Sequence, residues 1–161
     1  MNDFTKFLKG EMTVSQSTYL SQVAAKLPKE ADQRSFAIRM LVHYVGDLHQ
    51  PLHSTARVDH MYPSGDRGGN SETIPSKSGV SNLHFVWDSV VYKYTGKPVL
   101  PLSSSDFSWY TTESEKLSSS YPVLSTEIKE GDFNAWAQES FEISEKDVYP
   151  GKHINICHKL S

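Results

Sequence analysis

The stretch HYVGDLHQPLH, from His43 to His53, places three histidines and one carboxylate within eleven residues. His43 and Asp47 stand four residues apart, so on an α-helix they lie about 40° apart around the axis and about 6 Å apart along it. Imidazole and carboxylate groups are donors that zinc takes readily in proteins. The residue types and their spacing therefore predict a metal site in this stretch.

The same pair of residue types recurs further along the chain. His84 and Asp88 again stand four residues apart, within the segment NLHFVWD. A single histidine on an apolar helix face is more often a hydrogen-bonded core residue than a ligand, but two such pairs together with His53 reverse that preference. Three protein ligands with positions open to water are typical of catalytic rather than structural zinc sites. The repetition predicts a site that holds more than one metal ion.

The first pair falls on a predicted helix that runs from Lys29 to His49. It continues the row formed by Phe36 and Met40, and we expect this face of the helix to point into the core. An ionised carboxylate buried there needs a partner, and a divalent cation would provide one. Pro51 ends the regular helix and places the last histidine of the stretch in the turn that follows.

Three further segments carry apolar residues at helical spacing: Ser15–Leu27, Leu83 to about Tyr92, and Asp132–Asp147. Asp106–Leu117 is a weaker helix prediction. In the last segment the inward side chains are expected to be Phe133, Trp136, Ala137, Phe141 and Ile143. Since no strand-like alternation is long enough to predict a sheet, we expect an all-α fold, a bundle of several helices with long loops.

The segment Ser54–Val80 is rich in proline, glycine and hydroxyl residues and has no sustained period, which predicts a long loop. Within it, DRGGN (Asp66–Asn70) is expected to form a tight, backbone-exposed turn. Tyr62 is more typical of loop packing than of base stacking. Met1–Met12 carries no clear signal. A long loop in a compact domain is often functional, so Asn70 is a candidate substrate-loop residue.

Other histidines and aromatic residues carry less information. His49 points away from Asp47, and two interpretations stay open: a hydrogen-bond donor, beside the metal site, to a ligand or to the backbone, or a cap at the C-terminal end of its helix. Trp87 is expected to pack in the core rather than to stack on a base. The histidines expected to be solvated are His60, His153 and His158.

Composition limits the possible function classes. With 161 residues, 37% hydrophobic and 22% charged, the chain is expected to form one globular domain. Its net charge of −3 excludes a general basic field, so a nucleic-acid substrate would be held by bound metal or a local patch. The lone Cys157 excludes an internal disulfide and a cysteine-rich zinc module. No apolar run predicts a membrane span, and Met1–Gly10 is charged where a signal peptide would be apolar.

Taken in order and spacing, HYVGDLHQPLH, DRGGN and NLHFVWD resemble the zinc-dependent single-strand-specific nucleases of fungi, plants and protists, also called type I nucleases or 3'-nucleotidase/nucleases. The resemblance is specific from Phe36 to about Tyr92, and Trp136–Ser140 and Val148–Tyr149 are similar to a later helix of that family. It implies an all-helical fold of the phospholipase C/nuclease type with three Zn²⁺ ions in a cleft. It also implies an endonuclease that hydrolyses single-stranded RNA and DNA to 5'-phosphate products by metal-activated water, with 3'-nucleotidase activity.

The resemblance also assigns roles to individual residues. It implies that His53, His84 and Asp88 form the complete protein ligand set of one zinc ion. His43 and Asp47 match ligands of the neighbouring zinc pair, with Asp47 as the carboxylate that bridges the pair and takes part in catalysis. By the same resemblance, the protein would be a monomer, secreted or lysosomal/vacuolar, that acts on single-stranded nucleic acid and 3'-nucleotides.

Other ligands of the family have no match in this sequence. The family completes its zinc pair with an N-terminal tryptophan, a nearby histidine, and an Asp and a His from an intervening segment, whereas no Trp or His precedes His43 here. We therefore expect residues 1–161 to be an internal fragment of a single zinc nuclease domain, truncated at both ends. Two alternatives stay open: a metal-binding but catalytically inactive fragment, and a zinc phospholipase C-like phosphodiesterase.

Overall fold

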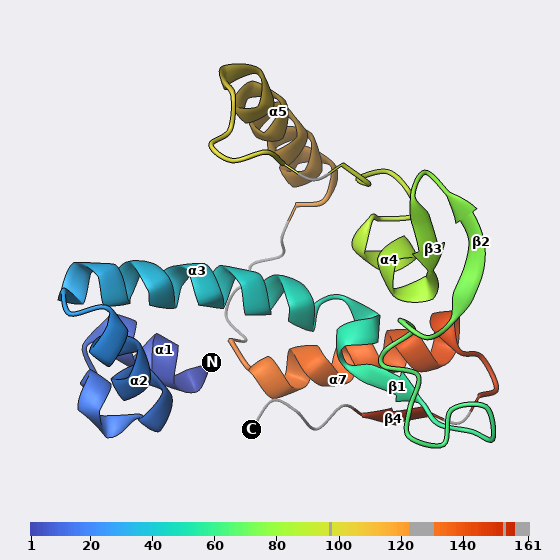
Figure 1. Ribbon diagram of the computed structural model, residues 1–161, viewed down its shortest axis with the longest axis horizontal. Helices are drawn as coiled ribbons and strands as arrows, with labels where there is room; N and C mark the ends of the chain where they lie inside the picture. The colour runs from blue at the N-terminus through green and yellow to red at the C-terminus, as the bar shows by residue number, and fades with distance from the viewer. Residues whose placement is uncertain (97, 123–130, 153, 157–161) are drawn as a thin grey trace. The chain divides into compact units, whose positions relative to one another are not determined.

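A computed structural model describes residues 1–96, 98–122, 131–152 and 154–156 of the chain. These residues form six α-helices and two antiparallel sheets of two strands each (Figure 1). The chain divides into two compact units, one made of Met1–Ser71 with Phe133–Ser161 and the other of Glu72–Asp132. The prediction of a mostly helical fold is confirmed, whereas the expectation that the chain lacks a sheet is wrong.

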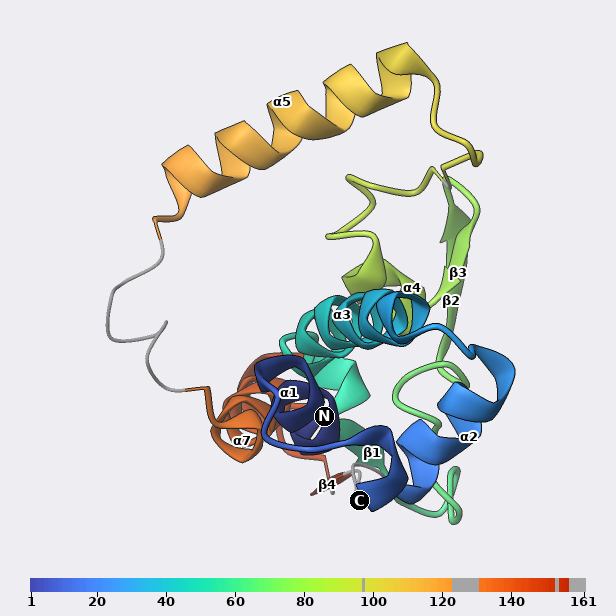
Figure 2. The same ribbon diagram turned by 90° about the vertical axis from the view of Figure 1, so that its left-hand side faces the viewer.

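The core of the first unit lies where three helices meet: α1 (Asn2–Lys9), α2 (Thr18–Lys26) and α3 (Glu30–Leu48). Figure 2 shows α1 lying against α3. Phe4 and Phe7 stand three residues apart on α1, so both reach the same side of that helix. The buried residues of this core are Phe4, Phe7, Leu20 and Ala37.

A short 3-10 turn, η2 (Pro51–His53), follows the end of α3 at Leu48. Its first residue is a proline, which has no N–H to continue the helical hydrogen bonds. The side chain of Gln50 caps the turn by accepting a hydrogen bond from the Leu52 N–H. The predicted long helix and the predicted place of His53 just beyond it are therefore confirmed.

The C-terminal helix α7 (Phe133–Ile143) packs against η2 and α3 (Figure 1). It continues into a π-helical turn, η3 (Ser144–Val148). Ser140 of α7 is buried, and its hydroxyl donates a hydrogen bond to the Leu48 carbonyl at the end of α3. An element more than eighty residues further along the chain therefore supports the turn that carries His53.

A small sheet joins the same two regions of the first unit. β1 (Thr55–Arg57) follows η2 directly and pairs antiparallel with β4 (Ile154–Ile156). A two-stranded sheet is marginally stable by itself, so this one depends on its packing against the rest of the unit.

The second unit begins with a hairpin of β2 (Thr73–Lys77) and β3 (Val80–Asn82). The two residues of its turn, Ser78 and Gly79, have φ angles of 52° and 79°. Positive φ at both positions is the geometry of the type I′ turn that favours hairpins. β3 ends at Asn82, and the next helix begins at the residue that follows.

That helix, α4 (Leu83–Asp88), is capped by the Asn82 side chain, which accepts a hydrogen bond from the Phe85 N–H at 2.8 Å. The predicted helix to Tyr92 is wrong at its end, since α4 stops at Asp88. The next residues take left-handed φ angles of 48° at Val90, 53° at Val91 and 68° at Tyr92. Val90, an apolar residue of the predicted segment Leu83 to about Tyr92, is exposed. Valine has a lower helix propensity than straight-chain residues, which weakens the helix at this point.

The longest helix of the second unit is α5 (Ser104–Ser120). It starts at a capping box, in which Ser103 and Asp106 each accept a hydrogen bond from the other's backbone N–H. The helix continues past the predicted end at Leu117 through three serines and ends before Tyr121. Most of its side chains are exposed.

Three other predictions of structure are corrected. Met1–Met12, where the sequence carries no clear signal, contains α1. The predicted loop Ser54–Val80 contains β1 and β2. Ile143 is exposed rather than inward, because Ser140 and Ser144, four residues apart, form the buried side at this point and Ile143 lies to one side of it; Tyr149 is the next buried residue. His153, Cys157 and His158 lie outside the described residues. In the described ranges, no helix has both the length and the apolar character that a membrane span requires.

Candidate metal centre

In the first unit, Asp47 lies between two histidines. Its Oδ2 atom is 3.4 Å from Nε2 of His43, one turn back on α3, and its Oδ1 atom is 3.9 Å from Nε2 of His53 at the end of η2. Two ligand atoms of one tetrahedral zinc ion, each about 2.0–2.2 Å from the metal, lie about 3.3–3.6 Å apart. The distance from Asp47 to His43 lies in this range, and the distance from Asp47 to His53 is slightly longer than the range. Since the two oxygens have different imidazole neighbours, this carboxylate could contact two metal positions.

The prediction that this face of α3 points into the core holds for Phe36 and Met40, which pack against the core of the first unit, and is wrong for His43. The His43 side chain is 65% exposed and the Asp47 side chain 30% exposed. Ile38 and Val42, which are apolar but lie on another side of α3 than this row, are also exposed. The buried residues of the helix are Gln33, Ala37 and Leu48. The pair is therefore reachable from solvent, and no burial cost demands a cation.

In the second unit, His84 and Asp88 form a pair of the same geometry on α4. Nε2 of His84 is 3.5 Å from Oδ2 of Asp88, close to the corresponding distance on α3. The His84 side chain is mostly buried, at 14% exposed, while that of Asp88 is 41% exposed. The Asn82 cap fixes the first turn of this short helix and with it the position of His84. The donor set of nitrogen and carboxylate oxygen fits zinc in both units.

The remaining histidine of the stretch, His49, lies at the C-terminal cap of α3. Its Nδ1 atom is 2.7 Å from the Val45 carbonyl oxygen, and its ring lies 5.0 Å from the ring of Trp136. A hydrogen bond to a backbone carbonyl in the last turn of the helix fits both interpretations of His49. His60 is exposed, as expected, and Trp87 is half-buried.

The DRGGN turn is tight but not backbone-exposed, so that prediction is wrong in part. Asp66, Gly68 and Gly69 are buried, and only Arg67 and Asn70 are exposed. The Asn70 side chain donates a hydrogen bond to the Arg67 carbonyl at 3.0 Å. The turn is buried because its carboxylate collects hydrogen bonds from distant parts of the unit, which no local sequence pattern indicates.

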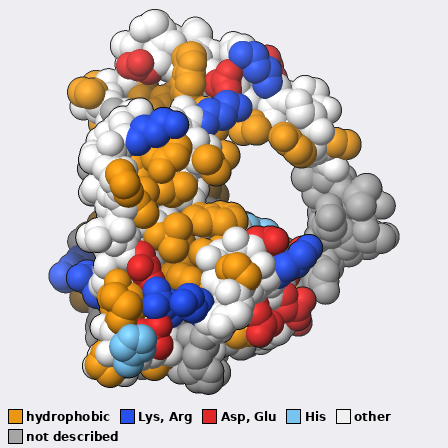
Figure 3. All heavy atoms as spheres, turned by 90° about the vertical axis from the view of Figure 1, so that its right-hand side faces the viewer, with side chains coloured by type: hydrophobic (Ala, Val, Ile, Leu, Met, Phe, Trp, Pro, Cys, Tyr) orange, Lys and Arg blue, Asp and Glu red, His pale blue; other side chains and the backbone are white. Residues whose placement is uncertain are grey.

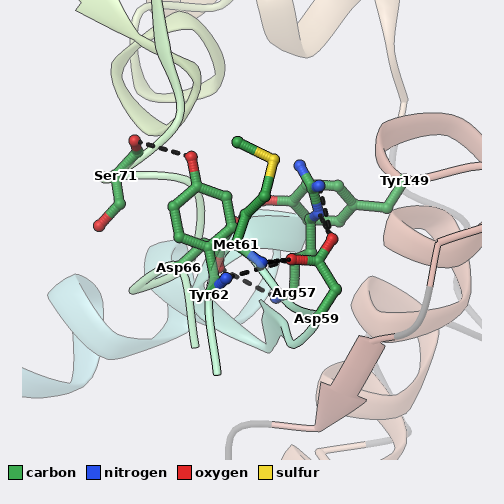
Figure 4. A network of polar contacts seen from close by, with 7 residues as sticks. All are labelled: Arg57, Asp59, Met61, Tyr62, Asp66, Ser71 and Tyr149. Atoms are coloured by element: carbon green, nitrogen blue, oxygen red, sulfur yellow. Dashed lines mark hydrogen bonds and ion pairs between the residues drawn. The ribbon is translucent and has the colours of Figure 1, made fainter. Parts of the chain in front are cut away.

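Polar contacts around this turn form the network in Figure 4. Asp66 accepts hydrogen bonds from the Arg57 N–H and from the Tyr149 hydroxyl. The Arg57 guanidinium pairs with Asp59 and lies over the Tyr62 ring. Burial raises the pKa of Asp59, but hydrogen bonds from Arg57 and from two backbone N–H groups outweigh it, and the net pKa is lowered. The Tyr62 hydroxyl donates to the Ser71 carbonyl, as loop packing predicts.

The surface carries no single basic field on the face that Figure 3 shows, where acidic and basic side chains are interspersed. A hollow of about 600 Å³ in the second unit is lined by α5 and the segment before it. Its walls include the aromatic side chains of Tyr94, Trp109 and Tyr110 and the ion pairs of Glu113. None of the predicted metal ligands lines it, so it is a separate feature from the candidate centre.

Comparison with known proteins places these motifs in context. The profile of the S1/P1 nuclease family matches residues 2–159. Endonuclease 4 of Arabidopsis thaliana is 42% identical over 55 residues, which are 34% of this chain and 16% of that protein. Endonuclease 2 of the same plant is 40% identical over 53 residues, 33% of this chain and 16% of that protein.

Nuclease S1 of Aspergillus oryzae is 34% identical over 53 residues, 33% of this chain and 16% of that protein. The aligned part of the chain thus spans only 16% of the length of these curated relatives. No solved structure matches the chain. Because the family profile extends over nearly the whole sequence and includes both histidine–aspartate pairs, the chain belongs to the S1/P1 nuclease family.

Proposed function

We propose that this protein is a zinc-dependent endonuclease that hydrolyses the phosphodiesters of single-stranded RNA and DNA to 5'-phosphate products. We also propose 3'-nucleotidase activity. The observation that carries the proposal is the position of Asp47 between His43 and His53, in a chain that belongs to the S1/P1 nuclease family. The names of the relatives, Endonuclease 2, Endonuclease 4 and Nuclease S1, support the same reaction class.

For the metal, we propose that His53, His84 and Asp88 are the protein ligands of one zinc ion. His43 and Asp47 contribute to a neighbouring zinc pair, with Asp47 as the bridging ligand. The proposal is supported by the donor types and by the short distance within each histidine–aspartate pair. When bound, zinc lowers the pKa of a coordinated water and neutralises charge on the reacting phosphate.

The residues of the chain have definite tasks in this scheme. Each histidine offers a neutral Nε2 lone pair, and each carboxylate supplies the negative charge that holds a divalent cation. The exposure of His43 and Asp47 leaves a path for a phosphate to approach. Asn70, exposed at the DRGGN turn, is proposed to contact the substrate, and His49 to support the end of α3.

We further propose that residues 1–161 belong to a single nuclease domain of a monomeric protein that is secreted or lysosomal/vacuolar. The family resemblance supports this proposal. With a net charge of −3, the chain is proposed to attract its nucleic-acid substrate through the bound cations rather than through basic side chains.

A cleavage assay tests the proposed function. Protein stripped with a chelator and then supplied with Zn²⁺ should cut single-stranded DNA, leave 5'-phosphate ends, and release phosphate from 3'-AMP. Asp47→Asn should lower the rate at least about 100-fold, because loss of residues that merely support a ligand already costs 10–100-fold. Asp32→Asn, which alters an exposed carboxylate on the first turn of the same helix, is the matched control and should keep the rate.

Two outcomes would contradict this proposal. Stoichiometric zinc with no cleavage of DNA or RNA would identify a metal-binding chain without catalysis. Hydrolysis of phosphatidylcholine in place of DNA would identify a phospholipase C-like phosphodiesterase.

A further inference from the structure

We propose that Asp66, Gly68 and Tyr149 are positioning residues that fix the turn bearing His53. The inference rests on the proposed function, because fixing this turn matters for the site only if His53 is a metal ligand. It is carried by contacts within the first unit that join the DRGGN turn, η2 and the C-terminal segment.

The first part of this arrangement is a fully buried carboxylate. Asp66 accepts hydrogen bonds from the Arg57 N–H at 3.0 Å and from the Tyr149 hydroxyl (Figure 4). It also accepts one from the Gly69 N–H at 3.0 Å. Its own N–H donates to the Arg57 carbonyl. A carboxylate removed from water is tolerated only when such donors replace its hydration. These bonds therefore hold the DRGGN turn in one place relative to β1 and to the end of η3.

The second part is the contact between the DRGGN turn and η2. Gly68 has a φ of 61°, and a Cβ atom at this position would lie 2.3 Å from the Leu52 carbonyl oxygen and 3.3 Å from that of Thr55. The backbone of the turn thus packs directly on the peptide groups on either side of His53. Only glycine permits this approach, because any side chain would displace η2 or the turn.

The third part is the C-terminal segment, which supports both ends of the ligand-bearing stretch. Tyr149, only 4% exposed, reaches Asp66, and Ser140 donates a hydrogen bond to the Leu48 carbonyl, next to Asp47. The two contacts cross 83 and 92 residues of sequence. Residues after 132 therefore restrain the backbone at Asp47 and at His53 together.

Restraint of this kind matters for metal binding. Ligands that are held in place before the ion arrives bind it more tightly than ligands that must be ordered, and loss of an outer partner typically costs 10–100-fold in affinity. The Tyr149 hydroxyl acts from further out, because it contacts Asp66 and reaches His53 only through the DRGGN turn packed on η2, so we expect an effect at the lower end of this range.

The first test uses Tyr149→Phe, which removes one hydroxyl and keeps the ring. We expect zinc affinity, measured by competition with a chromophoric chelator, to fall about 10-fold. In the zinc-free protein, ¹⁵N NMR of the imidazoles should show the His53 signal shifted or split, with its assignment taken from His53→Gln. Tyr62→Phe is the matched control, because its hydroxyl bonds the Ser71 carbonyl in the same loop rather than Asp66, and it should change neither quantity.

The second test uses Gly68→Ala, which should weaken zinc binding and disturb the His53 signal at least as strongly. Gly10→Ala is its control, because Gly10 also has a positive φ, 76°, but a Cβ atom there meets nothing within 4 Å. Both variants place alanine at a positive φ, which strains the backbone, and only Gly68→Ala is expected to displace η2. A thermal unfolding curve for each variant shows which of them is folded at the assay temperature.

The outcomes separate this inference from the proposed function. If the wild-type chain binds no zinc, the proposed function fails, while the imidazole signal of His53 in the zinc-free variants still tests positioning. If Tyr149→Phe and Gly68→Ala are folded, bind zinc like the wild type and leave the His53 signal unchanged, the positioning inference is overturned.

Discussion

At the scale of residues, the two histidine–aspartate pairs are the strongest chemical feature of the chain. Their Nε2–Oδ2 distances, 3.4 Å on α3 and 3.5 Å on α4, are alike although the two helices differ in length and surroundings. Helix geometry alone accounts for this, because residues four apart lie on the same side of any α-helix. Such pairs can be predicted from the sequence, whereas the solvent exposure of their side chains cannot.

His84→Ala should lower zinc content and zinc-dependent stability together. At free zinc one hundred times the dissociation constant, binding contributes about 2.7 kcal/mol to the free energy of unfolding, and this contribution should largely vanish. The measurements are metal analysis and denaturant unfolding with and without Zn²⁺. His60→Ala, at an exposed loop histidine, is the control and should behave like the wild type. An unchanged zinc stoichiometry in His84→Ala would remove this residue from the ligand set.

The sequence predicts the identity of the candidate ligands but not what supports them. His43, Asp47 and His53 follow from residue type and spacing. The contact of Tyr149 with Asp66 spans 83 residues, and no periodicity or turn signal connects such positions. The core-directed face of α3 was predicted correctly at Phe36 and Met40 and wrongly at His43, because the buried side of the helix is centred on Ala37 and Leu48, which are rotated away from that row.

At the scale of elements, helix starts were more predictable than helix ends. Asn82 caps α4 as its side-chain chemistry suggests. The end of α4 at Asp88 depends on left-handed residues that are not glycines, and residue type gives no warning of them. The strands β1 and β4 are three residues long, too short for an alternating pattern, and they exist because distant segments meet.

Glu113 should make the contact between α5 and the segment before it sensitive to acid. Hydrogen bonds from Lys116 and from the Tyr94 hydroxyl lower its pKa below the ordinary 4.5, despite partial desolvation. A lowered pKa means that the ionised form stabilises the fold above pH 4.5, and that this stabilisation is lost as the pH falls through the lowered value.

The ring of Trp109 lies 6.0 Å from that of Tyr94 and reports on this contact. The ¹⁹F NMR signal of 5-fluorotryptophan at position 109 should therefore shift below pH 4.5 in the wild type. Glu113→Gln should already show the shifted signal at neutral pH. Glu115→Gln changes an exposed glutamate of the same helix and should retain the wild-type profile. Identical profiles for the wild type and Glu113→Gln would contradict the role given to this carboxylate.

At the scale of the whole molecule, composition and charge limit the possible function classes, and membership of the S1/P1 nuclease family supports the proposed one. A net charge of −3, with interspersed charges on the face shown in Figure 3, gives nucleic acid no general basic surface. The family profile covers residues 2–159 and so includes both compact units. The fold class followed from helical periodicity, whereas the division into two units depends on contacts that a one-dimensional pattern does not contain.

The proposed function depends on zinc coordination by His53, His84 and Asp88, and X-ray absorption at the zinc edge reports on that coordination. The zinc-loaded chain should show only nitrogen and oxygen neighbours at about 2.0–2.2 Å, with the outer-shell scattering of imidazole rings. His53→Ala and His84→Ala should each reduce the imidazole contribution. A sulfur neighbour at about 2.3 Å, which would indicate Cys157, or a spectrum without imidazole, would contradict the proposed centre.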